Sequence, residues 1–177
     1  MENSDFKQSR TYQNILSAYE DSLLANAKYG LFMKKATQEI LIEISFIFET
    51  ISRNEQFVAE RLRSILFEGT PETSQNLVEA STEELSNSNQ YREYSKIATD
   101  EGYADIASLF SGIANINLNH NNTLQTVIDD IHNNQLFCKP QQRLWLCLGC
   151  GNILSGECAP EVCPICGYPQ GYYEVFR

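Results

Sequence analysis

Apolar side chains recur at the α-helical period through the first 135 residues of the chain. The strict alternation that is typical of a half-buried strand is missing there. The pattern predicts four long helices, over residues 9–35, 37–67, 73–99 and 102–133. Gly69 and Pro71 separate the second helix from the third, because glycine favours a helix end and proline cannot continue the hydrogen-bond ladder. Four such helices with short connections predict a four-helix bundle over residues 1–137.

The two halves of the helical region repeat each other at an offset of 62 residues. Six pairs on the helices match at this offset: Tyr29 with Tyr91, Ala36 with Ala98, Glu39 with Glu101, Ile44 with Ile106, Phe48 with Phe110, and Ile51 with Ile113. Chance produces isolated matches at any offset, but six at one offset along the apolar stripes indicate a repeat. We therefore interpret the helical region as one helix pair that has been duplicated.

The composition changes after Gln135, and all six cysteines lie between Cys138 and Cys166. Glycine, proline and aromatic residues are frequent in this tail. A segment of this size buries too little surface to fold unaided and usually needs a metal ion or disulfides. We therefore predict a second, small domain over residues 138–177.

Four of the cysteines form two Cys-x-x-Cys pairs, Cys147 with Cys150 and Cys163 with Cys166. One tight turn presents both thiolates of such a pair to a single ion, and two pairs complete a tetrahedral set of four sulfurs. This set suits zinc, which is redox-inert, or a single iron, which carries one electron. The spacing alone does not decide between the two metals.

The other residues of the tail fit around this metal site. Gly151 and Gly167 directly follow the cysteine pairs and suit the positive φ that such turns need. Cys138 and Cys158 fall outside the pairs, and we expect both to be free thiols. Five aromatic residues are expected to pack a small core around the metal: Trp145, Tyr168, Tyr172, Tyr173 and Phe176.

The net charge of −10 and the pI near 4.6 disfavour nucleic acid and anionic lipid as partners, because both repel an acidic surface. The most apolar run, residues 40–48, is too short to span a membrane. The first ten residues lack the apolar stretch of a signal peptide. We therefore expect a cytoplasmic protein, in which paired cysteines bind metal rather than form disulfides.

The segment from Trp145 to Glu174, with its two cysteine pairs, resembles the rubredoxin domain at the end of rubrerythrins. The helical part is similar in Ala36-Thr-Gln-Glu39, in Ala98-Thr-Asp-Glu-Gly-Tyr103 and in Asn76-Leu77. The resemblance implies a mainly α fold, with a ferritin-like four-helix bundle and a small C-terminal rubredoxin-like β-ribbon metal domain, usually assembled as a dimer. It favours iron over zinc in the tail. In the family that the sequence resembles, this iron passes electrons to a di-iron site in the bundle, which reduces hydrogen peroxide.

The di-iron ligands of the family are incomplete in this sequence. Three of the matched positions keep a metal ligand, namely Glu55, Glu84 and His120. Four others do not, namely Ser22, Val58, Asn87 and Asn117. Two irons need several carboxylates and two imidazoles, so we do not expect an ordinary di-iron centre. The three surviving residues either hold a single second metal ion or form a metal-free polar pocket.

Three functions therefore stay open at this stage. The first is an electron-transfer protein with iron at the four cysteines, which is linked to defence against peroxide and is served by an electron-donating reductase. The second is an active NAD(P)H-linked hydrogen peroxide reductase that uses an altered metal site in the bundle. The third is a structural zinc-ribbon protein beside an inert bundle. The electron donor and acceptor are not identified by any motif.

Overall fold

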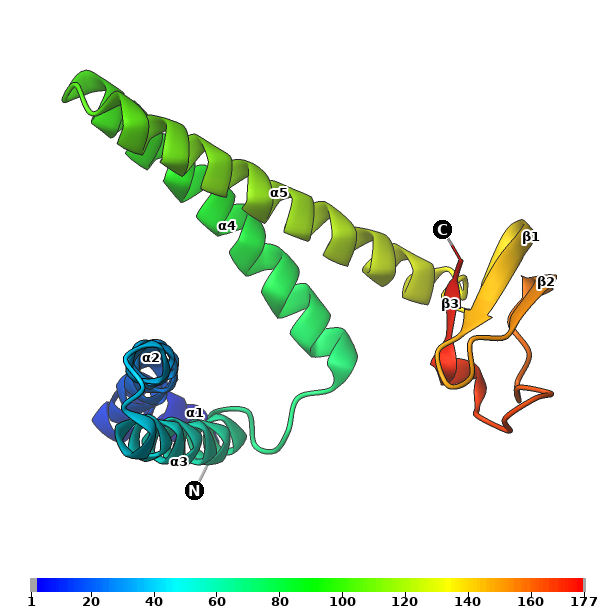
Figure 1. Cartoon of the computed structure of the whole chain (residues 1–177), viewed down its shortest axis with the longest axis horizontal. Coiled ribbons are helices and arrows are strands. Elements are labelled where there is room, and N and C mark those ends of the chain that lie inside the picture. The colour runs from blue at the N-terminus through cyan, green and yellow to red at the C-terminus, as the bar shows by residue number, and fades with distance from the viewer. Residues whose placement is uncertain (1–2, 177) are drawn as a thin grey trace. The chain divides into compact units, whose positions relative to one another are not determined.

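Residues 3–176 are described in this computed structural model, which divides into two compact units between Glu72 and Thr73. The first unit holds a short helix and two long ones, and the second holds two long helices and a small sheet (Figure 1). The helices are α1 (Asn3–Lys7), α2 (Arg10–Gln38), α3 (Ile42–Leu66), α4 (Thr73–Asp100) and α5 (Ala104–His132). The predicted helices are thus confirmed to within a few residues, whereas α1 was not foreseen.

The four long helices form two hairpins, α2 with α3 and α4 with α5, and the two hairpins repeat the same packing. In the first hairpin, Tyr29, Phe32 and Phe48 contact one another with ring centroids 5.7–6.0 Å apart. In the second hairpin, Tyr91, Tyr94 and Phe110 form the matching triad at 5.7–5.8 Å. Each member of the second triad lies 62 residues after its counterpart, so the repeat read from the sequence extends to the contacts.

The turns of the two hairpins also match. The second residue after the first helix of each hairpin has a left-handed backbone, Ile40 with φ 61° and Gly102 with φ 86°. In both turns the next N–H bonds back into the helix, from Leu41 to the carbonyl of Ala36 and from Tyr103 to that of Ala98. Glycine adopts this conformation without steric cost, whereas a β-branched residue such as isoleucine does not.

Small residues bring the two helices of each hairpin together. Ala36 and Ala98 are buried at matching positions, and Ser88 is buried where its hydroxyl donates to the carbonyl of Ala114. Large apolar side chains remain exposed in both units, among them Leu24, Leu31, Phe46, Phe57, Ile97, Ile106, Leu109 and Ile116. Each hairpin therefore keeps an apolar surface that its own two helices do not cover.

The sheet of the second unit has three antiparallel strands in the order β2-β1-β3. The central strand is β1 (Cys138–Cys147), flanked by β2 (Ile153–Cys158) and β3 (Tyr173–Val175), and the short 3-10 helix η1 (Gln170–Tyr172) precedes β3. A mainly α chain with a small C-terminal β domain is thus confirmed. The predicted domain boundary after residue 137 stays a prediction, since Phe137 and Cys138 both lie inside the second unit.

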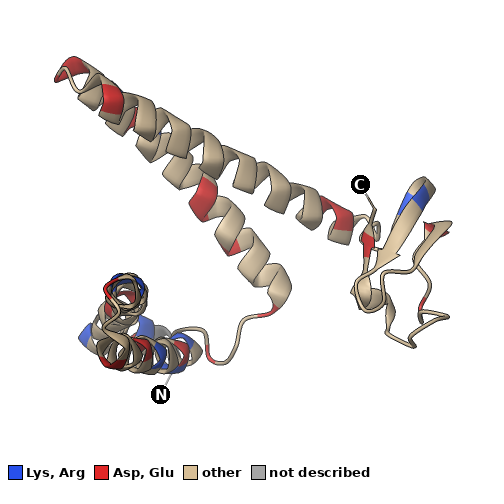
Figure 2. Ribbon diagram, in the orientation of Figure 1, with Lys and Arg blue, Asp and Glu red and all other residues tan. Residues whose placement is uncertain are grey.

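Charged residues are distributed unevenly along the described chain. Figure 2 shows lysine and arginine on the α2–α3 hairpin and on β1, while α5 carries acidic residues only towards its two ends. No helix in the described part of the chain combines the length and the apolar character that a membrane span requires.

Candidate metal centre

Two turns of the same design present the four paired cysteines. In the first, which follows β1, the N–H of Gly151 donates to the carbonyl of Cys147 at 2.8 Å. In the second, the N–H of Gly167 donates to the carbonyl of Cys163 at 3.0 Å. Gly151 and Gly167 have φ of 77° and 74°, as the sequence predicted for the residues after each pair. A Cβ atom is disfavoured at such φ values, so both turns depend on glycine.

The four sulfurs converge on one point. Sγ of Cys147 lies 3.7 Å from Sγ of Cys166, and Sγ of Cys150 lies 3.8 Å from Sγ of Cys163. All four lie within 4.8 Å of one another. A tetrahedral ion with metal–sulfur bonds of about 2.3 Å separates its ligands by about 3.8 Å. The spacing therefore fits a single tetrahedral ion, and no other group of three or more His, Cys, Asp or Glu side chains in residues 3–176 meets the same test.

Burial and hydrogen bonding distinguish the sulfurs. Cys147 and Cys163 are buried, while Cys150 and Cys166 are exposed. The hydroxyl of Tyr173, and then the backbone N–H groups of Cys166 and Ile165, lower the pKa of Cys163 to about 6. The same interaction with Cys163 raises the pKa of Tyr173. This hydroxyl is buried and has no hydrogen-bond partner among the described atoms, so the thiolate of Cys163 is the acceptor that the site offers it.

The core of the metal domain is smaller than the sequence predicted. Trp145 and Tyr173 are buried together with Cys147, Ala159 and Cys163, as predicted for the two aromatic residues. The other three predicted core aromatics, Tyr168, Tyr172 and Phe176, are each more than 40 % exposed. The ring of Tyr168 instead covers the first turn, where a Cβ on Gly149 would come within 2.4 Å of it.

Cys138 and Cys158 are not free thiols, contrary to the expectation from the sequence. They are paired across β1 and β2 and form a disulfide. The prediction was wrong because the two residues are separated by 20 positions in the chain, and only the strand register makes them neighbours. The four ligand cysteines in the same domain stay free.

Comparison with known proteins adds a second line of support. Residues 145–174 match the family model described as "Rubrerythrin, rubredoxin-like domain", and residues 75–144 match the model described as "Rubrerythrin". Rubrerythrin-1 of Clostridium acetobutylicum is 30 % identical over 96 % of this chain and 95 % of its own. Rubrerythrin of Nitratidesulfovibrio vulgaris is 31 % identical over the same shares. The chain belongs to the rubrerythrin family.

A solved structure of mixed-valence nigerythrin covers 95 % of this chain and 87 % of its own, at 22 % identity and a TM-score of 0.35. Membership of the rubrerythrin family, together with the sulfur geometry, supports an iron-binding redox protein with a rubredoxin-like four-cysteine site.

The residues that rubrerythrin resemblance assigned to the bundle are only partly brought together. In the α4–α5 hairpin, Nδ1 of His120 lies 3.4 Å from a carboxylate oxygen of Glu84. At the matching positions of the α2–α3 hairpin stand Ser22, which is buried, and Val58, which is 46 % exposed. Glu55 also lies in that hairpin, on α3. Within the second unit, the structure therefore shows a contact between one imidazole and one carboxylate rather than a complete metal site.

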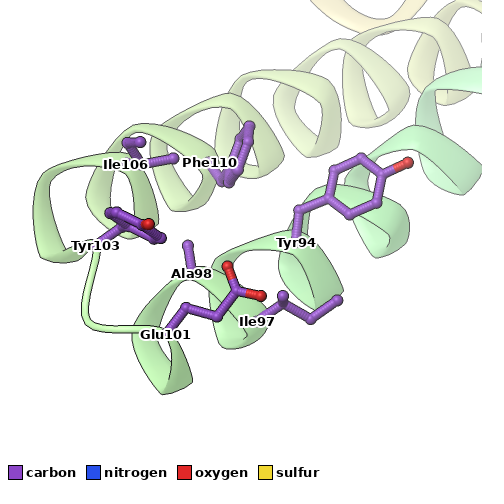
Figure 3. Close-up of a pocket in the computed structure, with 7 residues that line it drawn as sticks. All are labelled: Tyr94, Ile97, Ala98, Glu101, Tyr103, Ile106 and Phe110. Carbon is purple, nitrogen blue, oxygen red and sulfur yellow. The ribbon is translucent and has the colours of Figure 1, made fainter.

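The α4–α5 hairpin of this rubrerythrin also has an apolar cavity of about 460 Å³ close to its turn. Figure 3 shows its lining, in which Glu101 is the one charged side chain: Tyr94, Ile97, Ala98, Glu101, Tyr103, Ile106 and Phe110. Most of these side chains belong to the uncovered apolar surface of the hairpin. An apolar helical partner matches this surface better than a charged ligand does.

We predict that Tyr173→Phe weakens metal binding at the four cysteines. Without the hydroxyl, the pKa of Cys163 rises from about 6 towards its ordinary value, so protons displace the metal at a higher pH. We expect a loss of about tenfold in metal affinity and an upward shift in the pH midpoint of metal release, measured with a chromophoric chelator. Tyr172→Phe, at an exposed neighbouring ring, is the matched control and should leave the midpoint unchanged. Equal midpoints for the wild type and Tyr173→Phe would contradict the role given to this hydroxyl.

Proposed function

We propose that this rubrerythrin-family protein transfers single electrons through an iron ion held by Cys147, Cys150, Cys163 and Cys166. Four thiolates allow bound iron to cycle between Fe(III) and Fe(II), which carries one electron. The observation that supports this most directly is the pair of sulfur distances, 3.7 and 3.8 Å, which fit one tetrahedral ion. The buried hydroxyl of Tyr173 is the chain's own means of stabilising negative charge on the sulfur of Cys163.

The exposed side of the metal centre is the proposed place of electron exchange. Cys150 and Cys166 are exposed, and the apolar side chains of Leu148, Val162 and Ile165 beside them are 59–70 % exposed. An apolar rim around a shielded metal suits brief docking of a redox partner protein, in this case an electron-donating reductase. We place this exchange in the cytoplasm, where a reducing environment keeps the ligand thiols available for metal.

We further propose a link to peroxide and oxidative-stress defence, but with an incomplete di-iron site. Ser22, Val58 and Asn117 offer neither a carboxylate nor an imidazole where the family resemblance places ligands. The 3.4 Å contact between His120 and Glu84 favours one alternative, an active NAD(P)H-linked hydrogen peroxide reductase with an altered bundle metal site. A structural zinc ribbon is the alternative without redox activity, because zinc fits the same four sulfurs.

We also propose a homodimer, in which a hairpin of a second copy covers the apolar surface of each hairpin. The connection between α3 and α4, residues 67–72, spans at most about 25 Å even when fully extended. The 25 residues of α3 extend over about 37 Å. A ferritin-like bundle needs a crossover as long as the bundle, so the second hairpin comes from another copy. A site that joins Glu55 to Glu84 and His120 then depends on this assembly.

Protein produced with iron supplied should contain one iron per chain at the four cysteines and absorb visible light as a ferric tetrathiolate. Dithionite should bleach the colour and air should restore it, because the metal exchanges one electron. The measurement is metal analysis by mass spectrometry together with the visible spectrum. Colourless protein with zinc as its sole metal would establish the structural alternative, and Cys150→Ser should abolish the spectrum.

Reduced protein mixed anaerobically with hydrogen peroxide separates electron transfer from peroxide reduction in the bundle. We expect His120→Ala to be oxidised within about twofold of the wild-type rate in stopped-flow absorbance, because the bundle ligands are incomplete. His132→Ala, an exposed position near the end of the same helix, is the matched control. A loss of tenfold or more in His120→Ala alone would support the altered-metal peroxide reductase instead.

The assembled protein should have the mass of two chains in size-exclusion chromatography with light scattering. Inserting about 20 Gly/Ser residues between Gly69 and Pro71 should shift the mass towards one chain. The longer connection can then run the length of a bundle, so both hairpins of one chain can pack together. A Gly/Ser insertion of two residues at the same place is the control and should keep the dimer. A single-chain mass for the wild type would contradict the proposal.

A further inference from the structure

The disulfide between Cys138 and Cys158 lies apart from the metal site and has no role in it. Cys138 is the first residue of β1 and Cys158 is the last of β2, so the bond closes the open end of the β1–β2 pair. Neither residue lies within two positions of a metal ligand. The domain therefore contains two separate kinds of cysteine chemistry, four free thiols that converge on one ion and one oxidised pair.

The backbone around the disulfide shows what it holds. Strands β1 and β2 pair in regular register over residues 143–146 of β1. The register shifts between Cys138 and Arg143, so residues 139–142 bulge out of the ladder. Beyond the bulge, the N–H of Ala159 donates to the carbonyl of Phe137, and the side chain of Gln170 donates to the carbonyl of Ala159. Apart from these few contacts, the disulfide is what fastens the start of β1 to the sheet.

The start of β1 is also the connection from α5 to the metal domain. Helix α5 ends at His132, and Lys139 in the bulge forms an ion pair with Asp130 in the last turn of the helix. A cavity of about 240 Å³ opens beside this connection, lined by Ile131, Asn134, Leu136, Phe137, Cys138 and Gln170. Cys138 lines this cavity and Cys158 is exposed, so small molecules and thiols reach the bond from solvent.

We propose that Cys138 and Cys158 are a reversible dithiol/disulfide site, oxidised by peroxide and reduced by thiols, that clamps the connection between α5 and the metal domain. In the disulfide form, the bulge and the segment from residue 133 to residue 138 are fixed to β2. In the dithiol form, this connection loses its covalent link to β2 and keeps its hydrogen bonds, the packing of Phe137 against the core and the Lys139–Asp130 ion pair. The site is independent of iron and of the electron transfer proposed above.

The chemistry balances with hydrogen peroxide as the oxidant. The thiolate of exposed Cys158 attacks one peroxide oxygen, the O–O bond breaks, and one water leaves once the released oxygen is protonated. The thiolate of Cys138 then attacks the sulfur of the resulting sulfenic acid and expels a second water. The pair thus loses two electrons and two protons, and peroxide becomes two waters. A dithiol reductant reverses the reaction by exchange, becoming a disulfide itself.

The test is differential alkylation of the full-length protein, with metal bound at the four cysteines. The protein is reduced with dithiothreitol, desalted anaerobically, treated with one equivalent of hydrogen peroxide and then alkylated with N-ethylmaleimide. Trypsin cleaves after Arg143, and Glu-C cleaves after Glu157 and Glu161, which puts Cys158 in a peptide without any ligand cysteine. Mass spectrometry then detects its bond to Cys138 as a linked pair of peptides. We expect nearly complete linkage after peroxide and none after dithiothreitol, with iron-loaded and zinc-loaded protein behaving alike.

Two further measurements test the clamp and guard against misfolding. Hydrogen exchange of the Ala159 amide and of residues 133–143 should slow about tenfold on oxidation in the wild type. Cys158→Ser and Cys138→Ser should show no such dependence while keeping the metal content of the wild type. Full alkylation of both thiols after peroxide, or a bond to a ligand cysteine instead, would overturn the redox site. Equal exchange in the two redox states would overturn the clamp.

Discussion

The convergence of four cysteine sulfurs on one point is the constraint on which the C-terminal domain depends. The domain buries few large side chains, chiefly Trp145 and Tyr173, and these pack directly against the ligands Cys147 and Cys163. Such a small core cannot hold two turns and three short strands by apolar burial alone. A bound metal supplies what is missing, since binding energy at a structural site adds to the energy of folding. The same four cysteines therefore stabilise the fold of this domain and form its metal site.

The helical part follows a different principle. Each hairpin is built around small buried residues, such as Ala36 in the first and Ala98 in the second, which let its helices approach closely. The large apolar residues are left on the outside of each hairpin, where its own two helices do not cover them. The duplicated sequence thus makes two similar surfaces. The duplication did not keep the metal ligands equal, because Glu84 and His120 of the second hairpin correspond to Ser22 and Val58 of the first.

The chain has three candidate redox groups, which differ in how complete their ligands or reacting atoms are. The four-cysteine site is complete and matches a tetrahedral ion in its sulfur spacing. In the α4–α5 hairpin one carboxylate and one imidazole are in contact, whereas a di-iron centre uses several carboxylates and two imidazoles. The Cys138–Cys158 pair is a two-electron group that needs no metal and sits where α5 joins the metal domain. Redox chemistry in this chain is therefore concentrated at its C-terminal end.

Local pattern in the sequence was enough to predict much of this structure. The helical period located four helices, the 62-residue repeat predicted a duplicated helix pair, and the Cys-x-x-Cys-Gly spacing predicted both turns with glycine at positive φ. These features depend on residues close together in the chain, where backbone geometry allows few alternatives.

Contacts between distant residues were decided by the tertiary structure alone. Strand register made Cys138 and Cys158 neighbours, and the fold of the second turn placed the Tyr173 hydroxyl against Cys163. Tyr168, Tyr172 and Phe176 are aromatic like the two buried residues, yet the structure leaves them at the surface, with the ring of Tyr168 against Gly149. A sequence pattern records which residues prefer burial, but which of them find room is settled by packing in three dimensions.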